Sequence, residues 1–134
     1  MFLRILSLLF VFSLVAVPFD LGAQDQKVTY KKARALQTST AKKIVKVVEA
    51  LERVDEEGKE DPDFETVKEI LNELLDKKDS LRSYDRSVMW NYWGYVYFSE
   101  ERFSDAMRAY RNLLAEPEST IPLRVASLLS LIHI

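Results

Sequence analysis

The residues best suited to chemistry lie between Asp55 and Asp63, where six acidic side chains occur within nine positions. Paired carboxylates can act as a general acid and a general base, and clustered carboxylate oxygens can bind Ca²⁺. A catalytic acid needs apolar neighbours that raise its pKa, and a calcium loop needs ligands at fixed spacing. This stretch is almost entirely polar and lacks that spacing. We therefore expect a solvated loop between two helices.

The other side chains that commonly carry catalysis are scarce in this sequence. It has one histidine, His133, and no cysteine, which leaves too few residues for a Ser-His-Asp triad, a thiol nucleophile or a zinc-thiolate site. The three glycines, Gly22, Gly58 and Gly94, have neither the spacing of a phosphate loop nor that of a dinucleotide fingerprint. The sequence therefore predicts a protein that is not an enzyme and that carries no metal or other cofactor.

The strongest pattern lies between Met89 and Pro117 and indicates two helices that pack against each other. Apolar side chains recur there at helical spacing in two stripes, which a short turn separates. Small residues stand where the helices would touch, and large aromatic residues stand where they would fill gaps. The expected core consists of Trp90, Trp93, Gly94 and Tyr97 in the first stripe and Phe103, Ala106, Tyr110 and Leu113 in the second.

The spacing of these residues resembles the tetratricopeptide repeat (TPR), a helix-turn-helix unit that stacks into binding scaffolds. Trp93 stands where the repeat usually has leucine, Leu113 where it has alanine, and Pro117 comes one residue early. The resemblance identifies residues 84–120 as one TPR unit, with some other αα-hairpin as the alternative. It implies an all-α fold of antiparallel helical hairpins, a truncated TPR-like α-solenoid.

The resemblance also implies a surface for binding a partner. In TPR proteins the first helices of successive repeats line a concave groove, where extended peptides or partner helices dock. One face of the helix expected from about Asp85 to Phe98 would line this groove. Its polar member could hydrogen-bond a peptide backbone, and its last two aromatic members could contact a partner or pack against a following repeat. The face contains Val88, Asn91, Tyr92, Tyr95 and Phe98.

Residues 24–83 are expected to form an N-terminal helical hairpin, either a degenerate repeat or a cap. We expect its first helix to reach back toward Val28, and its second helix to open at Asp61 and Pro62. The second helix repeats the spacing of the later stripe, with Phe64 in the position that corresponds to Phe103. The apolar positions are Ile44, Val47, Val48 and Leu51 in the first helix and Phe64, Val67, Leu71 and Leu74 in the second.

Charge is divided unevenly along this hairpin. Lys27 to Arg53 contains eight basic and two acidic residues, whereas Val54 to Asp79 contains four basic and eleven acidic residues. The basic block could attract lipid headgroups or nucleic acid, but it lacks the series of interleaved aromatic side chains that stack on bases. We expect instead that the two helices lie antiparallel with complementary charges, and we expect no nucleic acid partner.

The N-terminus has the features of a secretory signal peptide at residues 1–23. Arg4 gives a positive start, the chain from Ile5 to Val17 is a continuous apolar run apart from two serines, and Ala23-Gln24 offers a cleavage point. The run is shorter than the roughly 20 apolar residues that span a bilayer. We therefore expect a periplasmic or secreted protein, attached to the membrane only if the signal stays uncleaved.

The C-terminus is expected to contain the start of another helix and a non-native tail. Thr120 and Pro122 are typical of a helix start, so residues 121–128 should begin a helix that has no partner. Residues 129–134 match the translation of a transposase mosaic-end adapter used in sequencing libraries, so they are interpreted as an artefact. We therefore expect the N-terminal piece of a longer protein.

Three functions fit these expectations. The favoured one is an exported TPR scaffold that mediates protein–protein interaction in an envelope complex. Its partner would be a protein or peptide, because bacterial proteins of similar layout occur beside envelope machinery such as TonB-type energy transducers. The alternatives are the N-terminal interaction domain of a larger envelope enzyme and a purely structural, self-associating helical protein.

Overall fold

The structure is a computed structural model that describes residues 35–134, so the expected signal peptide at residues 1–23 lies outside the described residues. In the described part the chain is helical, and its only β-structure is one isolated bridge between Val54 and Glu60. The expectation of an all-α fold is therefore confirmed. The elements are α1 (Thr38–Leu51), α2 (Phe64–Asp76), the short 3-10 helix η1 (Lys78–Ser80), α3 (Ser83–Ser99), α4 (Phe103–Ala115) and α5 (Ile121–His133).

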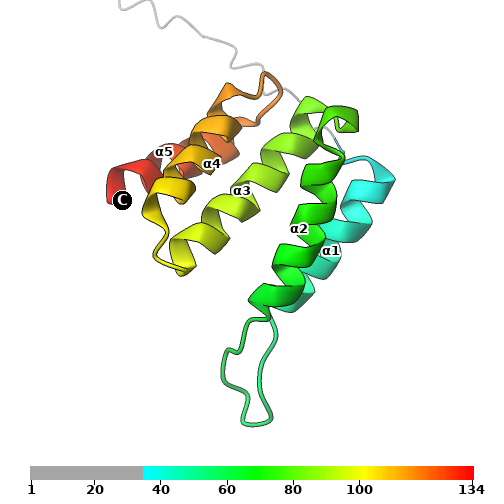
Figure 1. The fold of residues 1–134 in the computed structure, drawn as a ribbon, viewed down its shortest axis with the longest axis vertical. Coiled ribbons are helices and arrows are strands. Elements are labelled where there is room, and N and C mark those ends of the chain that lie inside the picture. The colour runs from blue at the N-terminus through cyan, green and yellow to red at the C-terminus, as the bar shows by residue number, and fades with distance from the viewer. Residues whose placement is uncertain (1–34) are drawn as a thin grey trace, which may run out of the picture. The chain divides into compact units, whose positions relative to one another are not determined.

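The helices form two hairpins and a fifth helix beside them (Figure 1). Helix α1 packs on α2, α3 lies in the middle and packs on α4, and α5 packs on both α4 and α3. The expectation that residues 121–128 have no helical partner is wrong. Helix α5 continues to His133 and so includes most of the segment interpreted as an artefact.

Helices α1, α3 and α5 begin at the same end of the fold. The buried Asp85 carboxylate, in the first turn of α3, accepts hydrogen bonds from Gln37 N at 2.8 Å and from Arg82 Nε at 3.0 Å. The Ser83 hydroxyl, also in that turn, accepts a hydrogen bond from Glu118 N at 3.0 Å. Gln37 directly precedes α1, and Glu118 lies just before α5. The starts of the three helices are therefore linked to one another through the first turn of α3.

The hydrogen bond from Gln37 also explains why α1 is shorter than expected. The sequence predicts that this helix reaches back toward Val28, but α1 begins at Thr38. Gln37 has an extended backbone, with φ −58° and ψ 143°, and its N–H is engaged by Asp85. The described residues before Thr38 are not helical.

The core lies between the hairpins and is built from the apolar stripes that the sequence predicts. Helices α2 and α4 are equal in length and begin at Phe64 and Phe103, the first residues of the two matching stripes. Three buried residues of each helix occupy matching positions. These are Val67, Leu71 and Leu74 in α2 and Ala106, Tyr110 and Leu113 in α4, which also buries Ala109.

Opposite charges join the first two helices, as expected. The Lys43 ammonium group on α1 forms an ion pair with the Glu73 carboxylate on α2. This hydrogen bond lowers the pKa of Glu73, and Lys77 and Lys46 act in the same direction. Both paired side chains are partly exposed, so the contact adjusts the α1–α2 packing and contributes little stability.

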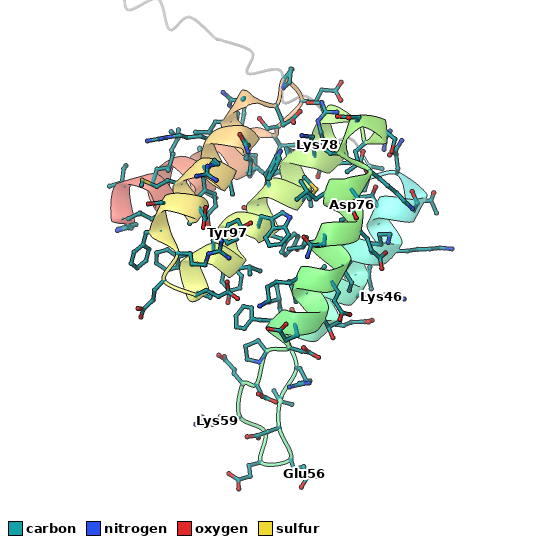
Figure 2. The ribbon with its side chains drawn as sticks, viewed as in Figure 1. Lys46, Glu56, Lys59, Asp76, Lys78 and Tyr97 are labelled. Carbon is teal, nitrogen blue, oxygen red and sulfur yellow. The ribbon has the colours of Figure 1, made fainter. Side chains whose placement is uncertain are left out.

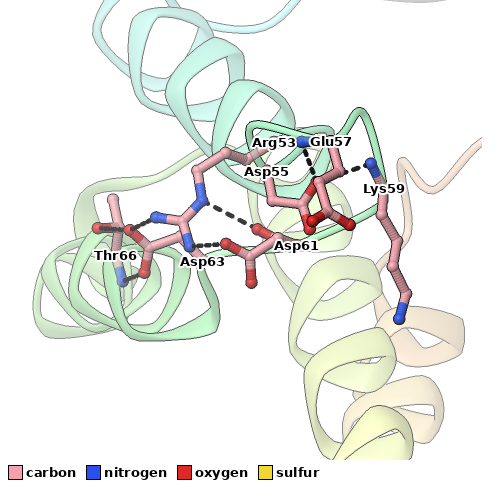
Figure 3. Close-up of polar contacts among 7 residues, drawn as sticks. All are labelled: Arg53, Asp55, Glu57, Lys59, Asp61, Asp63 and Thr66. Carbon is pink, nitrogen blue, oxygen red and sulfur yellow. Dashed lines mark hydrogen bonds and ion pairs between the residues drawn. The ribbon is translucent and has the colours of Figure 1, made fainter.

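The acidic loop between α1 and α2 is an ordered, finger-like hairpin, here called the acidic finger (residues 53–61, Figure 3). At its tip, Asp55 Oδ1 accepts hydrogen bonds from the backbone N–H groups of Glu57 and Lys59, both at 2.9 Å. Gly58 adopts the left-handed φ of 78° that this turn requires. Figure 2 shows Glu56 at the far end of the finger and Lys59 partway along it, both away from the helices.

Helix α2 begins two residues later than expected. Asp61 was the expected N-cap, but its side chain bonds Arg53 Nη2 at 2.6 Å at the base of the finger. Asp63 is the N-cap instead, because its carboxylate accepts hydrogen bonds from Thr66 N at 3.0 Å and Thr66 Oγ1 at 2.9 Å. These bonds hold the pKa of Asp63 below its usual value, and Arg53 lowers it further.

Candidate functional site

The closest approach between α3 and α4 occurs where Gly94 faces Tyr110. A Cβ atom at Gly94 would lie 2.5 Å from Tyr110 Cε1 and 2.6 Å from Tyr110 Cζ. The sequence predicts small residues where the two helices touch, and Gly94 stands at such a place, opposite a large ring. Glycine is required here because the tyrosine ring occupies the space of a side chain.

The Tyr110 ring links three helices. Burial raises the pKa of the Tyr110 phenol, and the nearby Ser130 hydroxyl on α5 partly offsets this shift. Tyr95 on α3 lies close enough to act on the same phenol. Tyr110 therefore sits where α3, α4 and α5 meet.

The other aromatic residues of the expected core in α3 differ in burial. Trp93 is buried and stacks on Tyr97, with ring centroids 5.0 Å apart. The Arg102 guanidinium covers the Tyr97 ring at 4.6 Å from its centroid. Trp90 is only half-buried, and it lines a hollow of about 310 Å³ between η1, α3 and the end of α4.

The wall of that hollow contains a two-point ion pair that sequence reasoning missed. Arg86 Nε and Nη2 donate to the two Glu116 carboxylate oxygens at 2.8 and 2.9 Å, and Arg86 Nη1 donates to Leu81 O at 2.6 Å. The bond to Glu116 raises the pKa of Arg86. The paired residues lie far apart in the sequence and no local pattern joins them, so the sequence contains no signal for this contact. It ties the start of α3 to the end of α4.

The burial of two residues is the reverse of what the sequence predicts. Phe103, expected in the core, is 44% exposed. It is the first residue of α4, where no further helix turn covers it, and it packs edge-on against Phe98 with centroids 5.7 Å apart. Val88, expected on the open face, is only 9% exposed and belongs to the core. Helix α3 contacts neighbours on several sides, so it has no single buried stripe.

The remaining residues of the expected partner face vary in exposure. Asn91 and Tyr92 are half-buried, and burial together with the nearby Glu52 raises the pKa of Tyr92. Tyr95 and Phe98 are 46% and 43% exposed, which is high for large aromatic side chains. These two are the most exposed members of the expected face.

Tyr95 and Phe98 belong to a larger group, here called the aromatic face (Phe64, Tyr95, Phe98 and Phe103). Phe64 contributes from the start of α2, with its ring centroid 6.3 Å from that of Tyr95. The sequence offers a signal for Phe64, since it opens α2 as Phe103 opens α4, at the head of a matching apolar stripe. The face therefore combines side chains from three helices.

Ion pairs lie near the aromatic face. Lys68 on α2 bonds Glu65 at 2.7 Å and Glu100, after α3, at 2.9 Å, and both contacts raise the pKa of Lys68. Arg102 bonds Asp105 at 2.6 Å, which raises the pKa of Arg102. The Lys68–Glu100 pair connects α2 to the α3–α4 turn, but as partly exposed pairs these contacts contribute little stability.

Between Ala35 and Ile134 no three histidine, cysteine, aspartate or glutamate side chains are placed to hold a metal ion. Across the same residues, none of the helices combines the length and the apolar character that crossing a membrane requires. No protein-family model matches the chain, and comparisons with curated proteins and with solved structures give no match. The TPR resemblance therefore stays a prediction.

Proposed function

We propose that this chain is a TPR-like helical scaffold that binds a protein partner, and that the aromatic face takes part in the contact. The observation that carries the proposal is the exposure of Tyr95 and Phe98, at 46% and 43%. Sequence reasoning left open whether these side chains pack against a following repeat. Helix α5 lies against α3 and α4, and both side chains still keep nearly half of their surface in solvent.

The arrangement of the helices supports the repeat assignment. The second helices of the two hairpins, α2 and α4, have equal length and bury side chains at matching positions. The first helices, α1 and α3, begin beside each other, joined through Asp85, and α5 begins beside α3 through Ser83. The first hairpin packs on the second through α2 and α3. Hairpins packed in series are the arrangement that gives repeat scaffolds an extended surface.

The chemistry of the aromatic face favours binding to a polypeptide. Exposed tyrosine and phenylalanine side chains bury a large area on binding and lose little conformational entropy, so such residues dominate the energy of many protein interfaces. Arg102 and Lys68 lie beside the face, and acidic side chains pair with each of them. An apolar centre with a charged rim is typical of protein interaction sites.

The proposal is tested by comparing variants in the cells that make the protein. The double variant Tyr95→Ala/Phe98→Ala should lose the co-purified partner, whereas Arg111→Ala, at an exposed position of α4, should retain it. Both variants should fold, because each changed side chain is well exposed. Equal recovery of the same partner by both variants would contradict the assignment of the face.

We also propose that the protein is exported, with residues 1–23 as its signal peptide. Its partner would then belong to an envelope complex, for example one with a TonB-type system. A fusion of residues 1–30 to a reporter that is active only outside the cytoplasm should show activity. The same fusion with Leu8→Arg and Leu9→Arg, which interrupt the apolar run, should not.

A further inference from the structure

The acidic finger stands next to the aromatic face. Asp63, the N-cap of α2, ends the connection from the finger and directly precedes Phe64, a member of the face. The ion pair between Lys68 and Glu100, at 2.9 Å, places the first turns of α2 beside the α3–α4 turn. In Figure 1 the finger extends from the same end of the α1–α2 hairpin. A polypeptide that lies on the aromatic face and continues past Phe64 therefore meets the finger.

The finger is ordered although it contributes nothing to the core. Every residue from Arg53 to Asp61 is exposed. The Arg53 guanidinium fixes the base of the finger, because it donates to Asp61 O at 2.9 Å and to Asp61 Oδ2 at 2.6 Å. An antiparallel bridge between Val54 and Glu60 joins the two sides. Hydrogen bonds thus hold the finger in a defined place, and the packing of the core does not require it.

The finger carries excess negative charge. It contains five acidic and two basic side chains, so its net charge is −3. The carboxylates of Asp55 and Asp61 accept hydrogen bonds within the finger. Those of Glu56, Glu57 and Glu60 are exposed and form no hydrogen bond or ion pair with any other described residue. Three carboxylates of the finger are therefore free to bind a cation.

The basic side chains nearby do not balance this charge. Lys68, beside the aromatic face, is paired with Glu100. Arg102 is paired with Asp105 at 2.6 Å and with Glu100 at 3.7 Å. On the finger itself, the Lys59 ammonium is the one basic group that has no acidic partner among the described residues. One free ammonium group against three free carboxylates leaves a negative potential beside the aromatic face.

We propose that the partner bound at the aromatic face is a basic polypeptide segment, which packs an apolar side chain on the aromatic rings and directs lysine or arginine side chains to the carboxylates of the acidic finger. Opposite charge on the two surfaces favours their encounter, and like charge disfavours acidic partners. Each side of the finger spans about 10 Å, at about 3.3 Å per extended residue, so the basic residues lie within about three to five residues of the apolar anchor. This inference rests on the proposed function, because it names the chemistry of the partner at that same face.

The experiment selects ligands for the immobilised full chain from a phage-displayed library of random dodecapeptides. Clones that bind the wild type but not Tyr95→Ala/Phe98→Ala are those that use the aromatic face. The expected result is that these clones carry more positive charge than the unselected library, with lysine or arginine a few residues from an aromatic or aliphatic side chain.

The role of the finger is measured with one selected peptide, synthesised with a fluorescent label, by fluorescence anisotropy. Glu56→Gln/Glu57→Gln should weaken its binding about fivefold at low salt concentration, as expected for two exposed charge pairs, and by less at high salt concentration. Asp76→Asn/Asp79→Asn is the matched control, because it removes the same charge at and after the other end of α2. Figure 2 shows Asp76 away from Glu56, so this variant should bind as the wild type does.

Two results would overturn the inference and leave the proposed function standing. The first is that the clones requiring Tyr95 and Phe98 are no more basic than the unselected library. The second is the same affinity for the wild type and for Glu56→Gln/Glu57→Gln. The absence of any clone that requires Tyr95 and Phe98 would also overturn the inference. Recovery of a partner from cells, which does not depend on the charge of the partner, would then decide whether the face binds a protein at all.

Discussion

Replacing Gly94 by alanine has two opposing effects on stability. The added side chain clashes with α4, and alanine has the higher helix propensity. The added carbon would lie 2.5 Å from Tyr110 Cε1, about 1 Å inside the roughly 3.5–4.0 Å at which carbon atoms usually meet. Tyr110 is buried, so its ring has little free space into which it can move. The clash should therefore cost free energy of unfolding.

Two opposing effects set the size of this change. Overpacking a core typically costs about 1–3 kcal/mol, and a contact this short against a buried ring belongs at the upper end. Alanine in place of glycine within a helix stabilises by about 1 kcal/mol. Gly94→Ala should therefore lower the free energy of unfolding by about 2 kcal/mol, the difference between the two effects.

The assay is urea unfolding followed by far-ultraviolet circular dichroism, with a double-mutant cycle. In the Tyr110→Ala background the ring is gone, so Gly94→Ala should instead stabilise by about 1 kcal/mol. The pair Arg111→Gly and Arg111→Ala, at an exposed position of α4, measures the propensity difference in this protein. The same effect of Gly94→Ala in both backgrounds would refute the contact with Tyr110.

Three further predictions concern single positions. Asp63→Asn should be less stable than the wild type near neutral pH, where the Asp63 carboxylate is ionised. Because the pKa of Asp63 in the folded state lies below 3.8, this difference in stability should disappear as the pH falls through that pKa. Measuring the free energy of unfolding at a series of acidic pH values tests this. Glu101→Gly should raise the free energy of unfolding in urea by up to about 1 kcal/mol, because Glu101 has a left-handed φ of 59°. Trp93→Ala should cost about 3–5 kcal/mol, and Trp90→Ala about 2 kcal/mol because it is half-buried; equal losses in urea unfolding would contradict the placement of these rings.

Helical spacing in the sequence was sufficient to predict the hairpins and most of their contacts. The pattern from Phe64 to Leu74 recurs from Phe103 to Leu113, and both segments are helices with the expected residues buried apart from the two phenylalanines that open them. Local spacing identifies such stripes because each helix of a hairpin buries one face.

The errors arise where that assumption fails. Helix α3 contacts neighbours on several sides, so Val88 is buried although it lies off the expected stripe. Phe103 follows the helical spacing but stands at a helix end, where nothing further covers it. Asp61 has the residue type of an N-cap, yet Arg53 engages it and Asp63 takes that position.

The aromatic face could be predicted only in part, because it depends on contacts between residues distant in the sequence. Tyr95 and Phe98 follow from the TPR resemblance, whereas Phe64 joins them through a ring contact between two helices, with centroids 6.3 Å apart from Phe64 to Tyr95.

The most direct test of the proposed function is site-specific photo-crosslinking in the cells that make the protein. A photoreactive phenylalanine analogue replaces Phe98 on the aromatic face, and the same analogue replaces Arg111 on α4 as the control. Binding through the aromatic face predicts one discrete protein adduct from position 98 and none from position 111. No adduct from position 98, or the same adducts from both positions, would contradict the assignment of this face as the partner site.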